Sequence, residues 1–203
     1  MMRIRYRSVL LNASLVVLFA AFAYANFARW QDTGRPVGLG AVLLEGFTAL
    51  LFVFRRSPQV TSGRALAWLA APVGSFAMLL ARPVAHPNEG PFGVFQLSQL
   101  LGLAVAIAAL GTLGRSFGIV AANRGIKTGG LYGVVRHPAY LGYALSYLGY
   151  VCENPSLRNM TLLAVSSGAQ LVRIDEEERM LARDSAYERY RARVRYRLIP
   201  RLY

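Results

Sequence analysis

The chain has 203 residues, of which 55% are hydrophobic and only 16% are charged, a composition that argues against a water-soluble domain. Its 23 basic and 10 acidic residues give a formal net charge of +13, but the basic residues lie between long apolar runs, which makes nucleic-acid binding an unnecessary explanation. The single cysteine excludes an intrachain disulfide, and no Cys and His cluster has metal-ligand spacing. These features indicate a small polytopic membrane protein without a metal site.

Three apolar runs in residues 1–90 predict the first membrane-spanning helices. The runs occupy residues 8–28, 37–54 and 65–81. A helix needs about 20 apolar residues to cross the hydrocarbon of a bilayer, and slightly fewer when the span is short. The first run follows three arginines, as in cleavable signal peptides and retained anchors; we favour a retained span because the charge distribution of the later connections requires it. Pro72 and Gly74 predict a kink in the third run.

The second run contains one acid, Glu45. An ionised carboxylate in the middle of a span costs roughly 2.5 kcal/mol or more, so this side chain should face protein, pair with a cation or stay protonated. Two interpretations are open: a neutral acid that is hydrogen-bonded inside the bundle, and a residue with a functional role.

The second half of the chain, residues 91–203, predicts a fourth span followed by a helical hairpin. Its apolar runs occupy residues 91–114, 138–152 and 157–172. The last two are near or below the minimum for spanning, so we expect a hairpin that crosses shallowly or packs inside the protein. Residues 173–203 are charged, with a helical pattern that ends at Pro200. The predicted fold is therefore all-α: a polytopic membrane helical bundle of four spans, a C-terminal helical hairpin and a cytosolic C-terminal helix.

The basic residues predict the orientation of these spans. Of the 23 Lys and Arg, 19 lie in the connections that would share one side of the membrane, and four lie in the others. Because cytoplasmic connections carry the excess of basic residues, both termini and the loop at 115–137 are expected in the cytoplasm. We expect a multi-pass protein of a bacterial inner membrane, and some of its basic residues could attract anionic lipid headgroups.

A glycine-rich turn at residues 127–133 runs directly into Arg136-His137-Pro138. Proline is favoured at the first position of a helix, so Pro138 should open the next helix with His137 at its cap. The unpaired backbone N–H groups of that first turn would then face a pocket and attract a carboxylate or phosphate, steadied by Arg136. The alternative for the glycine-rich segment alone is a tight turn without a ligand.

The helix after Pro138 carries two stripes with helical spacing. The small residues are Ala139, Gly142, Ser146 and Gly149, and the tyrosines are Tyr140, Tyr143, Tyr147 and Tyr150. The small residues predict close packing against another helix. The tyrosines could form a core or an interfacial belt, or they could form a wall that binds a cationic ligand through cation–π contacts.

Four consecutive acids, residues 175–178, follow the last apolar run. Most runs of charge are solvated helix faces. This one is placed where a helix would leave the membrane beside a cavity, and Tyr187, Tyr190 and a series of arginines follow it.

The motifs of the second half form one ordered pattern between about residue 115 and Pro200. It consists of the glycine turn, Arg-His-Pro-x-Tyr-x-Gly at 136–142, the short hairpin, Glu-Glu-x-x-Leu at 177–181, Tyr-x-x-Tyr at 187–190, Val194 and Pro200. This pattern resembles the isoprenylcysteine carboxyl methyltransferase superfamily, which includes phospholipid and methanethiol methyltransferases. The resemblance implies an integral-membrane enzyme that binds S-adenosylmethionine from the cytosolic side. Its acceptor would be lipophilic and come from the bilayer: a prenylcysteine-like carboxylate, a phospholipid amine or a small thiol.

The same resemblance implies roles for individual residues. Residues 1–90 would form N-terminal transmembrane helices, and residues 91–203 a catalytic, cofactor-binding half. Arg136 and Glu177 would lie closest to the methyl transfer. The residues implied in cofactor binding are Lys127, Gly129, Gly130, Leu131, His137, Pro138, Tyr140, Gly142, Glu178 and Tyr190.

Three alternatives to this assignment are open. The spacing from the acids to the first tyrosine is two residues shorter than in the family, so an alignment on the tyrosines moves the acid role to Asp175 and Glu176. Membrane sterol reductases, which use NADPH, carry a related Arg-His-Pro-x-Tyr-x-Gly segment, although no other nicotinamide signature is present. A non-catalytic membrane subunit would explain the spans but not the Arg-His-Pro turn.

Overall fold

The computed structural model describes residues 2–58, 60–84 and 93–203, with side chains from Val9 onward. Within these ranges the chain is almost entirely helical. The α-helices are α1 (Met2–Thr33), α2 (Pro36–Phe54), α3 (Ala65–Phe76), α4 (Val94–Leu113), α5 (Pro138–Glu153), α6 (Leu157–Leu181) and α7 (Ser185–Arg193). The 3₁₀ turns are η1 (Ala77–Leu80), η2 (Gly114–Ser116) and η3 (Gly130–Gly133). Strands β1 (Val60–Thr61) and β2 (Ala122–Asn123) pair antiparallel and connect the segment before α3 to the loop after α4.

Three helices of the described chain are long and apolar enough to cross a membrane: Val9–Thr33, Pro36–Phe54 and Val94–Ser116. They correspond to the first, second and fourth predicted spans; the first two residues of the fourth prediction, 91–92, lie outside the described part. The predicted third span is shorter, because α3 ends at Phe76 and only a 3₁₀ turn extends the helix to Leu80. Pro72 lies inside α3 and has no N–H to donate, which weakens the helix near its end.

Helix α6 joins the last apolar run and the acid cluster in one continuous rod of 25 residues. Ser156 caps it by accepting a hydrogen bond from the backbone N–H of Asn159 at 3.2 Å, as expected of serine at this position. The prediction of helical structure up to Pro200 is partly wrong. A turn after Leu181 breaks the helix, Asp184 caps α7, and residues 194–203 form a non-helical tail.

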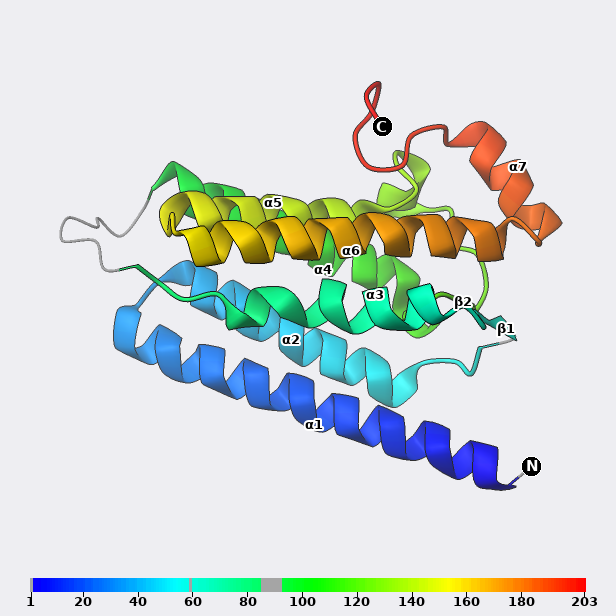
Figure 1. Cartoon of the computed structure of the whole chain (residues 1–203), viewed down its shortest axis with the longest axis horizontal. Coiled ribbons are helices and arrows are strands. Elements are labelled where there is room, and N and C mark those ends of the chain that lie inside the picture. Colours follow the sequence, from blue (N-terminus) through cyan, green and yellow to red (C-terminus); the bar gives the residue numbers. More distant parts are fainter. Residues whose placement is uncertain (1, 59, 85–92) are drawn as a thin grey trace.

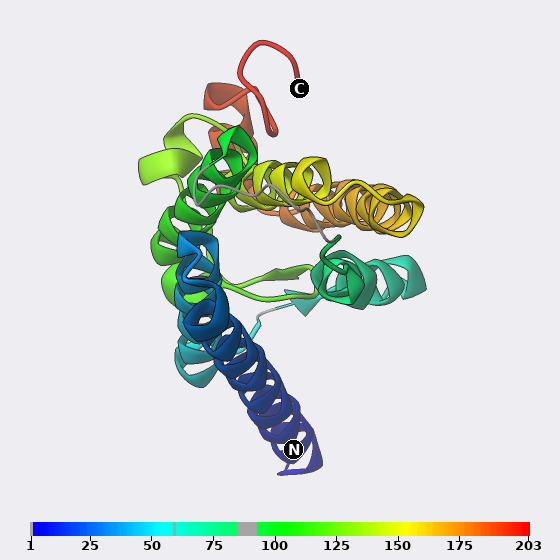
Figure 2. The same cartoon turned by 90° about the vertical axis from the view of Figure 1, so that its left-hand side faces the viewer.

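The helices form two walls joined along one side. Helix α1 packs on α2, α2 on α4, α4 on α5, and α6 on both α5 and α3, so α1, α2 and α4 make one wall and α3 and α6 make the other (Figure 2). The start of the chain, the β1–β2 pair, α7 and the C-terminal tail all gather at the same end of the bundle (Figure 1). Several segments rich in charge therefore lie toward one end of the bundle.

The closest contact between helices is that of α4 with α5. A Cβ atom on Gly142 would lie 2.6 Å from the backbone nitrogen of Ala106 and 2.7 Å from the carbonyl oxygen of Gly102. The prediction that the small residues of α5 permit close packing is confirmed. Gly142 was also predicted to bind the cofactor. In the structure it faces α4, because only a residue without a side chain lets α4 and α5 approach this closely.

Gly142→Ala is expected to destabilise the protein by about 1–3 kcal/mol, because the added methyl group would push two backbones apart. Gly168→Ala on α6 is the matched control, since no atom lies within 4 Å of its Cβ position; it should stabilise the helix by up to about 1 kcal/mol. Thermal unfolding of both variants in detergent measures the difference. Equal midpoints for the two variants would contradict the packing role of Gly142.

Candidate active site

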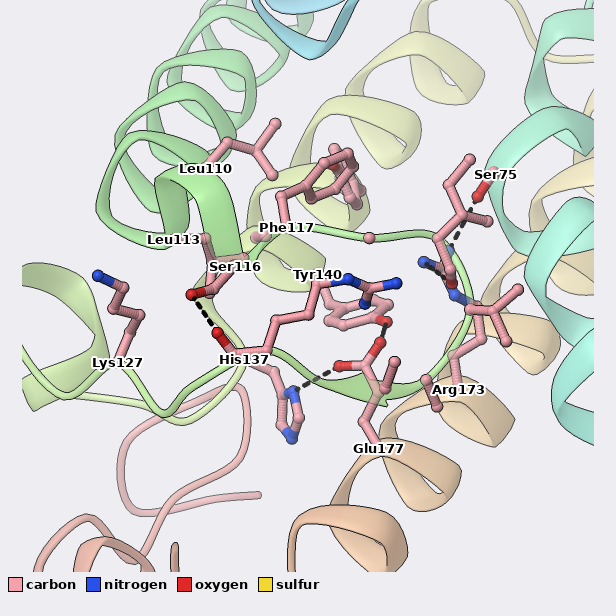
Figure 3. A pocket seen from close by; sticks show the side chains of 18 of the residues that line it. Ser75, Leu110, Leu113, Ser116, Phe117, Lys127, His137, Tyr140, Arg173 and Glu177 are labelled. Carbon is pink, nitrogen blue, oxygen red and sulfur yellow. Dashed lines mark hydrogen bonds and ion pairs between the residues drawn. The ribbon is translucent and has the colours of Figure 1, made fainter. Parts of the chain in front are cut away.

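A cavity of about 200 Å³ lies between the two walls. Its apolar part is lined by side chains from α1, α2, η1 and α4: Phe19, Leu44, Leu79, Leu110 and Leu113. Its polar part is lined by the loop after α4, the start of α5 and the end of α6. Figure 3 shows Lys127, His137, Tyr140, Arg173 and Glu177 around this polar part. One cavity thus joins an apolar region within the bundle to the charged end.

Behind the cavity, Glu178 binds three basic side chains. Its Oε1 accepts hydrogen bonds from Arg136 Nε at 2.7 Å and from His137 Nε2 at 3.1 Å, and its Oε2 pairs with Arg197 Nη2 at 3.0 Å. Burial alone would raise the pKa of Glu178, but the hydrogen bonds from His137 and Arg136 lower it to about 2. Glu178 is therefore held in its ionised form by the basic side chains around it.

The C-terminal tail holds the same segment through its backbone. The carbonyl oxygens of Tyr196 and Arg197 accept from the backbone N–H groups of Arg136 and His137, at 2.9 and 2.8 Å. As predicted, Pro138 opens α5 and His137 is its N-cap residue. The side chain of His137 makes no capping hydrogen bond, because Glu178 engages it. The start of α5 is thus held by the tail and by α6.

Glu177 faces the cavity one residue before Glu178. It accepts a hydrogen bond from the hydroxyl of Tyr140, and its Oε2 lies 3.8 Å from His137 Nδ1. Arg136 and Glu177, which the resemblance places closest to the methyl transfer, do not pair with each other, because Arg136 pairs with Glu178. Successive residues of a helix point about 100° apart, and it is Glu178 whose side chain reaches Arg136.

The other two acids of the cluster face elsewhere. Glu176 is buried and pairs with Arg64 at 3.2 Å and with Arg179 at 3.3 Å. Asp175 pairs with Arg197 at 3.0 Å. Within the part of the chain that the structure describes, Glu177 is the one acid of the four that lines the cavity. The geometry therefore favours the alignment on the Glu-Glu pair over the alignment on the tyrosines.

The structure brings half of the predicted site residues to the cavity. Those that line it are Arg136, Glu177, Lys127, His137, Tyr140 and Tyr190. Those that do not are Gly129, Gly130, Leu131, Pro138, Gly142 and Glu178. The glycine turn instead covers the end of α4, where a Cβ atom on Gly130, whose φ is +55°, would lie 3.0 Å from the Thr112 hydroxyl.

Burial raises the pKa of Tyr190 to about 12, so its neutral hydroxyl donates to the carbonyl oxygen of Tyr132 at 2.8 Å.

The tyrosine stripe is divided between two environments. Tyr140, Tyr143 and Tyr147 line the cavity, and Tyr150 does not. The rings of Tyr143 and Tyr147 stack with their centroids 6.2 Å apart, and the ring of Tyr140 meets that of Tyr143 edge-on at 6.4 Å. Three tyrosines thus form one aromatic wall of the cavity.

Sequence reasoning missed two buried arginines of the cavity, Arg124 and Arg173. Both were counted among the basic residues that set the orientation, which hid any further role. The spacing held a signal for Arg173, because residues four apart share a helix face and Arg173 precedes Glu177 by four. No pattern in the sequence distinguishes Arg124, which a loop directs inward.

Comparisons with known proteins identify the family of this chain. A family model described as phospholipid methyltransferase matches residues 93–188, which include α4, α5 and α6. A curated relative, methanethiol S-methyltransferase 2 from Bradyrhizobium diazoefficiens, is 30% identical over 210 residues, and the match covers 97% of this chain and 74% of the relative. The motif residues from Lys127 to Glu177 that line the polar part of the cavity lie inside the matched residues 93–188. The chain is therefore a methyltransferase and belongs to the phospholipid methyltransferase family, within the superfamily of the isoprenylcysteine carboxyl methyltransferases.

Proposed function

We propose that this membrane methyltransferase uses S-adenosylmethionine, bound from the cytosol at the polar part of the cavity, to methylate a lipophilic acceptor that arrives from the bilayer. The observation that carries the proposal is the two-part cavity, which joins the motif residues His137, Tyr140 and Glu177 to apolar side chains of α1, α2 and α4. A water-soluble cofactor and a membrane-dissolved acceptor could meet in such a cavity.

The residues present fit this cofactor. S-adenosylmethionine carries a sulfonium, an ammonium and a carboxylate. The aromatic wall suits a cationic group through cation–π attraction, Glu177 could accept from the ammonium, and Lys127 could pair with the carboxylate. When bound, the cofactor would supply a methyl group activated by the sulfonium charge.

The protein's contribution to such a transfer is alignment and exclusion of water. A displacement at carbon needs the acceptor atom, the methyl group and the sulfur in line, and holding them so supplies much of the reduction in the barrier. An amine acceptor would also have to lose a proton, which would give Glu177 the role of general base. A carboxylate acceptor would instead need cations in the cavity wall, and Arg136 is one that lines it.

The first test compares cofactors. We expect S-adenosylhomocysteine to bind the purified protein and to raise its thermal midpoint, whereas NADPH should do neither. Isothermal titration in detergent measures the binding of each compound, and thermal unfolding measures the midpoint. The sterol-reductase alternative predicts the reverse, and a non-catalytic subunit predicts binding of neither; membership of a methyltransferase family argues against both.

Glu177→Gln is expected to lower methyl transfer at least tenfold, because Glu177 is the acid of the cluster that lines the cavity and would accept from the ammonium of the cofactor, and a hydrogen bond to a charged group contributes about 1.5–3 kcal/mol. Asp175→Asn is the matched control, since its carboxylate is 47% exposed and lies outside the cavity lining. The measurement is turnover of radiolabelled methyl groups per folded protein. If Asp175→Asn or Glu176→Gln abolished turnover while Glu177→Gln kept it, the alignment on the tyrosines would be correct.

We also propose that both termini lie in the cytoplasm of a bacterium, with the enzyme in its inner membrane. Support comes from the 19 basic residues on one side of the predicted spans and from the gathering of both ends of the described chain at one end of the bundle (Figure 1). Reporter fusions after Tyr203 and in the connection between η1 and α4 should report opposite sides of the membrane. The same side for both fusions would refute this topology.

A further inference from the structure

The cavity contains a buried guanidinium without a partner. Arg124 is only 8% exposed and lines the cavity, and none of its side-chain nitrogens has a hydrogen-bond or ion-pair partner among the described residues, with Nε fully enclosed. Burial, and then repulsion from Arg55, lower the pKa of Arg124 to about 10, against the attraction of Glu177. Native proteins rarely bury an arginine without a counter-charge, because its desolvation costs several kcal/mol.

A second guanidinium of the cavity has only neutral partners. Arg173 is 7% exposed and donates to Ser75 Oγ at 3.1 Å, to Gln170 Oε1 at 3.0 Å and to the carbonyl oxygen of Ile119 at 3.0 Å. It also lies 5.1 Å from the centre of the Tyr140 ring, and its Nε is buried without a partner. No carboxylate of the described residues pairs with Arg173 within 4 Å.

Two adjacent residues of the loop after α4, Gly118 and Ile119, contact the two guanidiniums, one each. The guanidinium of Arg124 packs on Gly118, where a Cβ atom would lie 2.7 Å from its central carbon, and that of Arg173 binds the next residue, Ile119. Gly118 therefore provides room for Arg124 that any other residue would fill. Residues 118 and 119 are adjacent and line the cavity themselves, so the two guanidiniums contact neighbouring positions of its wall.

The acids of the cavity leave a positive excess near these arginines. Glu177 attracts both guanidiniums, but it is a single charge and accepts from Tyr140. The other acid of the lining, Glu45, lies on the spanning helix α2 and accepts from Asn26 at 2.9 Å; a neutral acid is the cheaper state there. Two buried arginines thus face one acid in the polar part of the cavity, before a cofactor that itself carries a net positive charge is bound.

We propose that Arg124 and Arg173 form an anion-binding subsite that holds the reacting group of the methyl acceptor, a thiolate or a carboxylate, so that the enzyme discriminates against amines. The inference rests on the proposed function. It assigns the anion to the acceptor because Arg173 lies one helical turn, about 6 Å, from Glu177 on the side away from the cytosolic end of α6. An amine acceptor would add no negative charge to this part of the cavity.

The chemistry of such a transfer balances. A thiol first gives its proton to water; the acceptor sulfur or oxygen then forms a bond to the methyl carbon, the bond from that carbon to the sulfonium breaks, and its electron pair remains on the leaving sulfur. Both reacting charges disappear, so the arginines stabilise the bound anion more than the transition state. Their removal should therefore act on acceptor binding more than on turnover.

The test measures binding of three probes of equal chain length, decanoate, decanethiol and decylamine, in the presence of S-adenosylhomocysteine. For the unchanged protein we expect decanoate or decanethiol to bind at least tenfold more tightly than decylamine. Arg124→Gln and Arg173→Gln should each weaken the preferred probe at least tenfold and leave the affinity for S-adenosylhomocysteine within threefold. Arg183→Gln is the matched control, because Arg183 is exposed and outside the cavity lining.

Several results would overturn the inference. Decylamine could bind as tightly as decanoate and decanethiol, or the two variants could bind all probes like the unchanged protein. A tenfold loss of S-adenosylhomocysteine affinity with unchanged probe binding would show that the arginines hold the carboxylate of the cofactor instead. Failure of the proposed function is distinguishable, because the unchanged protein would then not bind S-adenosylhomocysteine at all. Retained S-adenosylhomocysteine binding in the variants also shows that they are folded.

Discussion

The carboxylate of Glu178 is the interaction on which the site depends, because it joins three segments that are distant in the sequence. Arg136 and His137 come from the start of α5, Glu178 from the end of α6, and Arg197 from the tail. Without it, the basic side chains would repel one another at a crowded end of the bundle. Its depressed pKa of about 2 means that the carboxylate is ionised at any physiological pH. The orientation of α6 that results from these bonds is also what directs Glu177 into the cavity.

The fold was predictable where a single signal decided it. Apolar length predicted the three spanning helices, and the small residues of α5 predicted its contact with α4. The prediction was weaker where two signals compete. In α3 an apolar run of spanning length contains Pro72, and the missing donor shortened the helix. After Arg193 the helical charge pattern continues, but backbone bonds to the start of α5 keep the tail extended enough to reach Arg136 and His137.

The sequence predicted which residues belong to the site better than it predicted which of their side chains pair. The ordered motifs identified His137, Tyr140, Glu177 and Arg136, all of which line the cavity, but neighbouring acids on a helix differ only in direction, and sequence does not fix that direction to within one residue. Gly142 and Glu178 illustrate a second limit: a residue can belong to a motif because it holds the site together rather than because it lines the cavity. The buried arginines illustrate a third, since burial of a loop side chain depends on contacts such as that with Gly118, which only the folded chain reveals.

The attachment of the tail to Arg136 and His137 has a consequence for how the enzyme is made. The carbonyl groups at 194–197 follow every residue of the cavity lining in the sequence, so a ribosome synthesises them after the spanning helices have begun to enter the membrane. Until then Glu178 lacks Arg197, and the start of α5 lacks its backbone acceptors. The helices of the nascent enzyme can thus enter the bilayer before the start of α5 has these acceptors, and the wall of the pocket is complete only when residues 194–197 fold back onto the bundle.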